Sequence, residues 1–213
     1  MAKGKCRMNK IVIGIDQSYD NTGISICIDG EIVEVLNVQL NKYKTNTSKR
    51  RILSNALFYV EAFLKDHIPE DKLNDYSIIC IIERIRLQSQ GFLNFDYIKG
   101  IGALNAVIVD HFEQYDIPVY SVDTRSWKSN IVGSSKPMEN EYGLPEEKFP
   151  TILYCVKHGY KKYIIDYNVG RKKKGIIEKN GKKYTYDNDK ADAICISLYG
   201  FLPEKKQKLE LEH

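Results

Sequence analysis

The chain has 213 residues, 43% of them hydrophobic and 28% charged, and its formal net charge is +4. A chain of this length and apolar content can bury one good core, and no linker or repeat divides it, so we expect a single domain over residues 1–210. It contains no signal peptide and no run of about 18 apolar residues, so we expect a cytoplasmic protein without a membrane-spanning segment. The final residues, 211–213, resemble the start of a purification tag and are left out of the fold prediction.

The cysteines give no sign of disulfides or of a zinc site. They show no CxxC spacing, and three of them lie inside apolar runs, where a thiol acts as a small buried hydrophobe. We therefore expect free thiols at all five positions, which are 6, 27, 80, 155 and 195.

The predicted elements alternate between strands and helices along most of the chain. Unbroken apolar runs indicate buried strands, and apolar residues at helical spacing indicate helices. Asp29-Gly30 predicts a tight hairpin, and Asn180-Gly181 predicts a second one. In chain order the prediction is strand 10–16, strand 22–28, strand 31–39, helix 48–66, strand 77–83, helix 94–114, strand 117–121, helix 145–159, hairpin 176–186 and helix 189–201.

Two of the predicted strands end in a carboxylate. Ile11 to Asp16 is an apolar run that closes on an acid, and Ile78 to Glu83 repeats the pattern. Such runs are typical of strands buried on both faces. If the two strands are parallel neighbours, Asp16 and Glu83 emerge at the same carboxyl edge, which is where open α/β sheets place their sites.

Two further acids open the last predicted helix. Asp189 and Asp192 are three residues apart, so their carboxylates lie on one face of the helix start. Asp192 shares its stripe with the apolar residues Cys195, Ile196 and Tyr199, which predicts that it faces the sheet. The topology can therefore bring four acids to one edge.

Each acid also has a simpler structural explanation. Asp16 can be a turn residue after a strand, and Asp189 can cap the helix while Asp192 meets its dipole. These explanations do not account for the order of the acids along the chain, in which two strands in turn end in an acid and the last helix begins with two more. A set of carboxylates without a Cys or His cluster predicts a site for two Mg²⁺ ions, which Mn²⁺ can replace. Without metal these charges would repel one another, so Asp192→Asn is predicted to have a metal-free melting temperature equal to or above that of the parent.

The order of these residues resembles the RuvC family of Holliday junction resolvases, above all its phage and poxvirus relatives. The resemblance runs from about Ile11 to Phe201 and rests on a first strand that ends in Asp16, a loop that closes on Thr22-Gly23, the acid Glu83, and a terminal Asp-x-x-Asp-Ala at Asp189, Asp192 and Ala193. Thr124 to Gly133 resembles the segment in which a family lysine precedes a Val-Gly turn, and Lys128 is the matching position. The chain departs from the family pattern at Gln17-Ser18, where the family has Pro-Gly, and in the greater length of residues 137–186.

The resemblance implies an RNase H-like α/β fold, with a mixed five-stranded sheet flanked by helices and a basic insertion over about 137–186 before the last helix. It implies a homodimeric, Mg²⁺-dependent endonuclease that resolves four-way junctions or other branched DNA by paired nicks. By this resemblance Asp16 bridges both metals, Glu83 holds one, and Asp189 with Asp192 holds the other. Lys128 then lies near the scissile phosphate; the alternative is a solvated helix lysine.

Basic residues predict a nucleic-acid-binding surface near these acids. Between Lys161 and Lys190, ten Lys or Arg stand against four acids, and such an excess binds phosphate backbones, although it can also be a solvated loop. Phe92 can wedge against an unpaired base or pack in the interior. The DNA-binding candidates are Arg84, Arg86, Phe92, Arg171, Lys172, Lys173, Lys174, Lys182 and Lys183, and a second basic patch comprises Lys42, Lys44, Lys49, Arg50 and Arg51. The predicted helix at 94–114 contains four small residues, Gly100, Gly102, Ala103 and Ala106. They permit close packing, either within the chain or against a second copy.

Other functions fit parts of the sequence. An actin-like ATPase or sugar kinase also opens with a strand and an Asp, but it needs a glycine-rich phosphate loop, which Gln17-Ser18-Tyr19 does not supply. A non-catalytic nucleic-acid-binding module on the same fold and an RNA-directed RNase H-like nuclease stay open, because they differ from a resolvase only in cleavage or in substrate.

Overall fold

Three consecutive strands build one side of the central sheet. The computed structural model describes residues 9–85, 95–133, 149–167, 176–177 and 181–212. Strand β1 (Asn9–Asp16) pairs antiparallel with β2 (Asn21–Ile28), which pairs antiparallel with β3 (Glu31–Gln39). Asp29 and Gly30 join β2 to β3 with φ values of 50° and 92°, as expected for a tight hairpin turn.

The other side of the sheet begins with two parallel strands. Strand β4 (Tyr76–Glu83) runs parallel to β1, and β5 (Val119–Val122) runs parallel to β4. Strand β9 (Leu209–Leu211) then pairs antiparallel with β5. The strand order is β3-β2-β1-β4-β5-β9, so the sheet has six strands and not the predicted five. Leu211 of β9, which the fold prediction left out, pairs with Tyr120 of β5.

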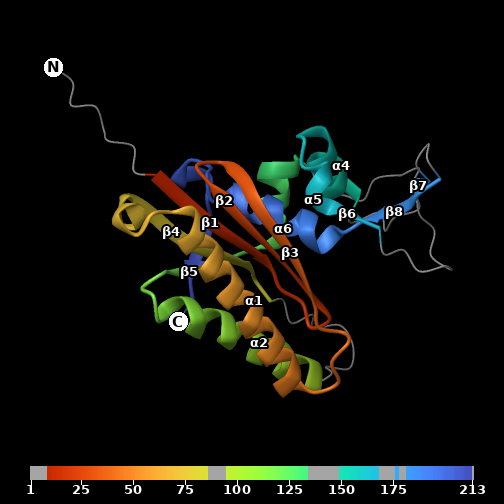
Figure 1. Ribbon diagram of the computed structural model, residues 1–213, viewed down its shortest axis with the longest axis horizontal. Helices are drawn as coiled ribbons and strands as arrows, with labels where there is room; N and C mark the ends of the chain where they lie inside the picture. Colours follow the sequence, from red (N-terminus) through yellow and green to blue (C-terminus); the bar gives the residue numbers. More distant parts are fainter. Residues whose placement is uncertain (1–8, 86–94, 134–148, 168–175, 178–180, 213) are drawn as a thin grey trace.

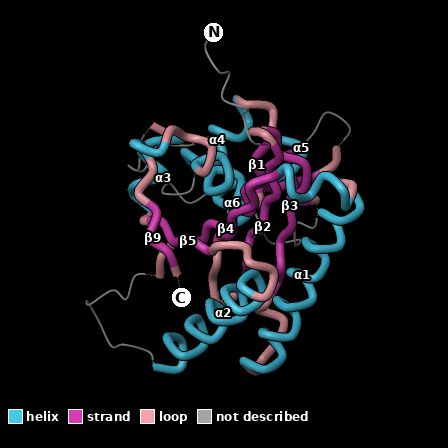
Figure 2. Tube along the Cα trace, turned by 90° about the vertical axis from the view of Figure 1, so that its left-hand side faces the viewer, coloured by secondary structure: helices cyan, strands magenta, loops and turns pink. Residues whose placement is uncertain are grey.

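Helices cover both faces of this sheet (Figures 1 and 2). Helices α1 (Asn46–His67) and α2 (Phe95–Glu113) lie on one face, where they pack on Ile11, Ile13 and Ile15. Helices α6 (Asn188–Tyr199) and α4 (Phe149–Lys157) lie on the other face. Alternate side chains of a strand point to opposite faces, so the apolar run of β1 supplies both layers of the core.

Shorter elements complete the fold. A three-stranded sheet, ordered β6-β8-β7, extends from the end of the molecule near α5 and contains the predicted hairpin. The part of helix 145–159 that is described begins at Phe149 and ends at Lys157, and residues 134–148 lie outside the described residues. The strands of the predicted hairpin are β7 (Ile176–Ile177) and β8 (Lys183–Tyr186). The elements that the sequence did not predict are η1 (Glu70–Asp75), α3 (Thr124–Trp127), the π-turn η2 (Lys128–Val132), α5 (Lys161–Ile164), β6 (Ile165–Asp166), η3 (Glu204–Lys206) and β9.

Two predictions of absence concern the parts of the chain that are described. No helix there is long and apolar enough to cross a membrane. Cys27, Cys80, Cys155 and Cys195 are all free and buried, as expected, and Cys6 lies outside the described residues.

Candidate functional site

Asp16 and Glu83 lie at the same edge of the sheet, as the sequence predicted. They are the last residues of the parallel neighbours β1 and β4. Ile15 and Ile82 are the last residues that pair between β1 and β4, and each acid follows directly after one of them. Parallel neighbours in this register place the two carboxylates side by side at the carboxyl edge.

Helix α6 brings Asp189 to the same edge through very close contact with the sheet. Gly23 pairs with Asp16 across β1 and β2. A Cβ atom on Gly23 would lie 2.0 Å from the carbonyl oxygen of Asp189. The glycine therefore allows the first turn of α6 to rest directly on the strand beside Asp16.

A different residue caps α6 than the sequence indicated. The N-cap is Asp187, whose side chain accepts a hydrogen bond from the backbone N–H of Lys190. The other carboxylate oxygen of Asp187 accepts from Asn37 Nδ2 at 2.5 Å, which ties the helix start to β3. Capping therefore does not account for Asp189, and Asp192 lies further inside the helix than the predicted third position.

Asp192 is the most deeply buried of the four acids, with 6% of its surface exposed. Its Oδ2 atom lies 3.9 Å from Lys128 Nζ, and the Lys128 side chain is only 15% exposed. Lys128 is thus not a solvated helix lysine, which was the structural alternative. Helix α6 does present Asp192 toward the protein interior, as the apolar stripe predicted.

Glu83 is held by two side chains to which the sequence had assigned no role, although both lie in the segment Thr124–Gly133 that resembles the family. Thr124 Oγ1 donates to Glu83 Oε1 at 2.7 Å, and Trp127 Nε1 donates to Oε2 at 2.9 Å. Trp127 is completely buried and is the only tryptophan of the chain. A single tryptophan within the polar segment Thr124–Asn130 is the sequence signal that could have drawn attention to it.

The donor chemistry of this edge suits hard divalent cations. Each Glu83 oxygen accepts one hydrogen bond from Thr124 or Trp127, and a carboxylate oxygen has a second lone pair for a cation. Among the described residues, however, no three His, Cys, Asp or Glu side chains converge as a metal-binding group. The fold thus gathers the acids at one edge without closing the four-carboxylate pocket that the sequence predicted.

A thiol beside the acids does not join the donor set. Burial raises the pKa of Cys195 well above its usual value, and hydrogen bonding to Cys155 and the charge of Asp192 raise it further. The thiol therefore stays protonated at neutral pH, and a protonated thiol is a poor metal ligand. Oxygen atoms remain the only ligands that this edge offers from charged side chains among the described residues.

The DNA-binding candidates fall into three groups. Arg84 follows β4, and its guanidinium forms an ion pair with Glu210 of β9. Lys182 and Lys183 belong to the hairpin that carries β8, and Lys182 Nζ lies 3.9 Å from the centre of the Tyr167 ring. Outside the described residues lie Arg86, Phe92, Arg171, Lys172, Lys173 and Lys174, together with residues 137–148, 168–175 and 178–180 of the proposed insertion.

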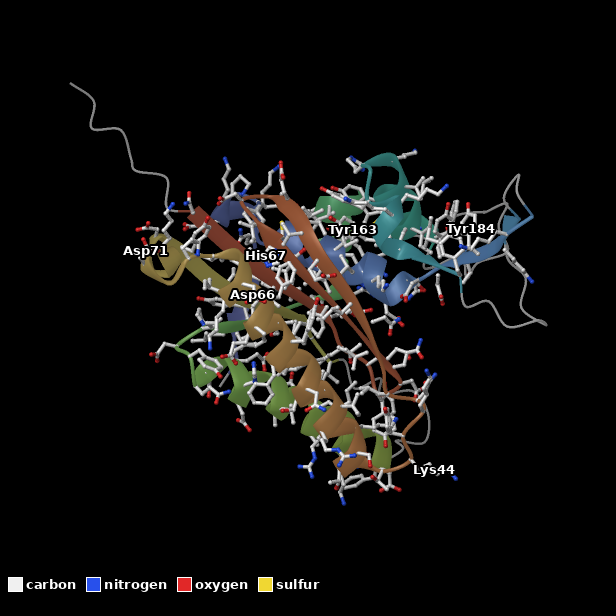
Figure 3. All side chains as sticks on the ribbon, in the orientation of Figure 1. Lys44, Asp66, His67, Asp71, Tyr163 and Tyr184 are labelled. Atoms are coloured by element: carbon white, nitrogen blue, oxygen red, sulfur yellow. The ribbon has the colours of Figure 1, made fainter. Side chains whose placement is uncertain are left out.

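Lys49 does not belong to the second basic patch. It is buried, its ammonium donates to the backbone carbonyl of Tyr19 at 2.7 Å, and it lies 3.4 Å from the centre of the Tyr19 ring. It therefore anchors the loop that follows Asp16. Lys42, Lys44, Arg50 and Arg51 are exposed, and Figure 3 shows Lys44 at the same end of the molecule as the start of α1.

The small residues of α2 serve different purposes. A Cβ atom on Gly100 would lie 2.2 Å from the Tyr19 ring, so this glycine packs within the chain. A Cβ on Gly102 would meet nothing within 4 Å. Of the four, Gly102 and Ala106 face solvent and stay available for contact with a second copy.

Comparisons with known proteins identify the fold. No family model and no curated protein sequence matches the chain. The RuvC structure from Thermus thermophilus has a TM-score of 0.53 at 14% identity and covers 88% of this chain and 91% of its own. The T. thermophilus RuvC in complex with a Holliday junction substrate has a TM-score of 0.52 at 11% identity and covers 89% and 90%. The yeast mitochondrial Holliday junction resolvase covers 88% of this chain and 75% of its own at a TM-score of 0.45 and 15% identity. The chain has a RuvC-like fold.

Proposed function

We propose that the protein is a metal-dependent endonuclease that resolves four-way junctions or other branched DNA. The observation that carries this proposal is that Asp16, Glu83 and the first turn of α6 lie at one edge of a RuvC-like fold. One of the similar structures is a RuvC bound to a Holliday junction substrate. Since fold does not fix function, the acids at this edge are the stronger argument.

Each acid has a role in this proposal. Asp16, Glu83, Asp189 and Asp192 hold two Mg²⁺ ions, for which Mn²⁺ substitutes. When bound, such ions activate a water and stabilise the leaving oxygen of a phosphodiester. Lys128, whose ammonium is close to the site and largely shielded from water, stabilises negative charge on the scissile phosphate.

Two groups of basic residues bind the DNA arms in this proposal. The first comprises Lys182 and Lys183 of the β8 hairpin together with Arg171, Lys172, Lys173 and Lys174, which lie outside the described residues. The second comprises Lys42 and Lys44, which are exposed before the start of α1. Lysines at the surface supply affinity for any sequence through release of counterions, which suits an enzyme that recognises a branch rather than a base sequence.

A homodimer would present two such sites to two opposing strands of a four-way junction. The outer face of α1 and α2 supports this assembly, because it exposes Phe58 and Tyr115, and it carries a groove of about 460 Å³. Most of the residues around the groove are polar, and the exposed ring of Phe58 gives it an apolar contact for a second copy. The groove is lined by Thr47, Arg50, Arg51, Ser54, Phe58, Val107, Asp110, His111 and Gln114.

The test is cleavage of a synthetic four-way junction, with linear duplex and an RNA:DNA hybrid of the same sequence as matched substrates. We expect paired nicks on opposing strands with Mg²⁺ or Mn²⁺ and none with Ca²⁺ or EDTA, because Ca²⁺ accepts looser geometry than the reaction does. Junction binding without cleavage would favour the non-catalytic module, and preferred cleavage of the hybrid would favour a ribonuclease. Light scattering on the same sample tests the dimer, since a monomer that still makes paired nicks would exclude it.

A further inference from the structure

One short turn of the chain contacts two of the candidate ligands at once. Thr124 and Trp127 both donate to Glu83 at the end of β4. The next residue, Lys128, pairs with Asp192 of α6. Glu83 and Asp192 are 109 positions apart in the sequence, so this turn contacts candidate ligands from two distant parts of the chain.

The indole of Trp127 contacts both Glu83 and the ammonium group of Lys128. Its N–H donates to Glu83 Oε2, and Lys128 Nζ lies 5.1 Å from the ring centre. The indole has no exposed surface. An indole N–H can only donate, so the hydrogen bond requires an acceptor on Glu83 and is strongest when that carboxylate is ionised.

The backbone of the turn is fixed independently of the site. Asp123 caps α3 by accepting from the backbone N–H of Arg125. At the other end the π-turn closes when the N–H of Gly133 donates to the carbonyl of Lys128, with Gly133 at a φ of 83°. Single π-turns of this kind are frequent at functional sites. The turn therefore has the rigidity that a support for metal ligands needs.

We propose that Trp127 and Thr124 are positioning residues that orient Glu83 for metal binding, and that their turn holds Glu83 and Asp192 in fixed relation. This inference rests on the proposed function, because it assigns a purpose to residues around its metal ligands. Hydrogen bonds to a ligating carboxylate restrict its orientation, so their loss weakens metal affinity even when the ligand itself remains.

The single tryptophan makes this proposal measurable without any assay of cleavage. Trp127 is the only indole in the chain, and its N–H contacts one candidate ligand. A cation bound at Glu83 would change the charge next to the ring and so change its fluorescence. The emission of the unmodified protein thus reports on the site directly.

The experiment titrates Mg²⁺ into the full-length protein and follows tryptophan emission, calorimetric binding and melting temperature. We expect saturable binding that alters the emission, and loss of that change in Glu83→Gln. Thr124→Val has nearly the same shape but lacks the hydroxyl donor, so it should need about 10-fold more Mg²⁺ for half-saturation, a typical loss for a residue that supports a ligand. Thr124→Ser keeps the donor and should bind Mg²⁺ like the parent. Trp127→Phe, followed by calorimetry, should show a loss similar to that of Thr124→Val.

The possible outcomes separate this inference from the proposed function. Unchanged half-saturation in Thr124→Val, with Mg²⁺ binding and nicking intact in the parent, would overturn the positioning role and leave the nuclease in place. Weaker Mg²⁺ binding in Thr124→Val, with parental Mg²⁺ binding in Thr124→Ser, would support the positioning role. This comparison holds whether or not Trp127→Phe folds. If calorimetry and melting show no Mg²⁺ binding by the parent, both the metal site and its positioning residues are refuted.

Discussion

At the scale of single residues, Asp192 shows how one contact changes an expectation. The sequence predicts four crowded carboxylates, so that Asp192→Asn relieves repulsion and has a metal-free Tm equal to or above that of the parent. In the structure the Asp192 carboxylate lies 3.9 Å from Lys128 Nζ, and both side chains are largely shielded from water. Removing one partner of a shielded pair leaves the other charge without compensation, and that cost opposes the relief of repulsion.

We therefore expect Asp192→Asn to lower the metal-free Tm, and Lys128→Gln to do the same. The double variant should lose less than the sum of the two, with a coupling free energy of about 0.5–3 kcal/mol for residues in contact. Thermal unfolding in EDTA measures all four proteins of this cycle. Strict additivity would mean that the pair does not form in solution. Junction cleavage should fall by orders of magnitude in Asp192→Asn, while junction binding in EDTA remains.

The residues of the site differ in how far they could be predicted. Asp16 and Glu83 follow apolar runs, and a local pattern is enough to place each at a strand end. Thr124 and Trp127 reach Glu83 across 41 and 44 positions of sequence. No periodicity within 124–127 encodes that contact, because it depends on β5 lying beside β4. The same holds for Asn37, which contacts the cap of α6 across 150 positions.

At the scale of elements, those with a strong hydrophobic pattern could be predicted from the sequence, and those that depend on tertiary contacts could not. The long strands are predicted by their apolar runs and α6 by the helical spacing of its apolar residues, and the structure confirms these elements. Strand β9 has three residues and forms only because β5 offers an open edge. The turn at 124–132 likewise exists through its caps and its contacts with the core. Elements whose stability comes from tertiary partners leave little trace in local sequence.

The contact between α6 and the sheet gives a prediction at this scale. Gly23→Ala would place a Cβ atom 2.0 Å from the Asp189 carbonyl oxygen, so the first turn of α6 must move away from Asp16. We expect a loss of about 1–3 kcal/mol in the free energy of unfolding, as for other overpacked sites, together with weaker Mg²⁺ binding. Gly102→Ala is the matched control, since its Cβ has open space inside α2.

The control should stabilise the protein by up to about 1 kcal/mol, because alanine favours a helix over glycine. Chemical denaturation measures both variants, and Mg²⁺ titration shows whether the site has shifted. A Gly23→Ala protein with the stability and Mg²⁺ affinity of the parent would show that α6 does not rest on β2 as closely as described.

At the scale of the whole molecule, exposed lysines lie both near the site and far from it. Figure 3 shows Lys44 and Tyr184 toward one end of the long axis and Asp71 at the other. The carboxyl edge with Asp16 and Glu83 faces the end that carries the exposed lysines before α1 and in the β8 hairpin. In the proposed function the lysines at this end bind the DNA backbone, and the fixed acids of the site need bound cations to accept its phosphates.

This arrangement predicts which lysines control the salt dependence of junction binding. Lys182→Gln with Lys183→Gln should weaken binding and reduce the slope of log affinity against log salt by about 0.9 for each phosphate that these lysines neutralise. Lys65→Gln with Lys72→Gln removes the same charge from the end of α1 and from η1, near Asp71 and away from the hairpin, so its slope should match that of the parent. Binding is measured in EDTA over a series of KCl concentrations, so that cleavage does not interfere. Equal slopes for the two double variants would mean that net charge alone attracts the DNA and that the hairpin does not touch it, whereas a change confined to the first variant places a DNA arm along β8.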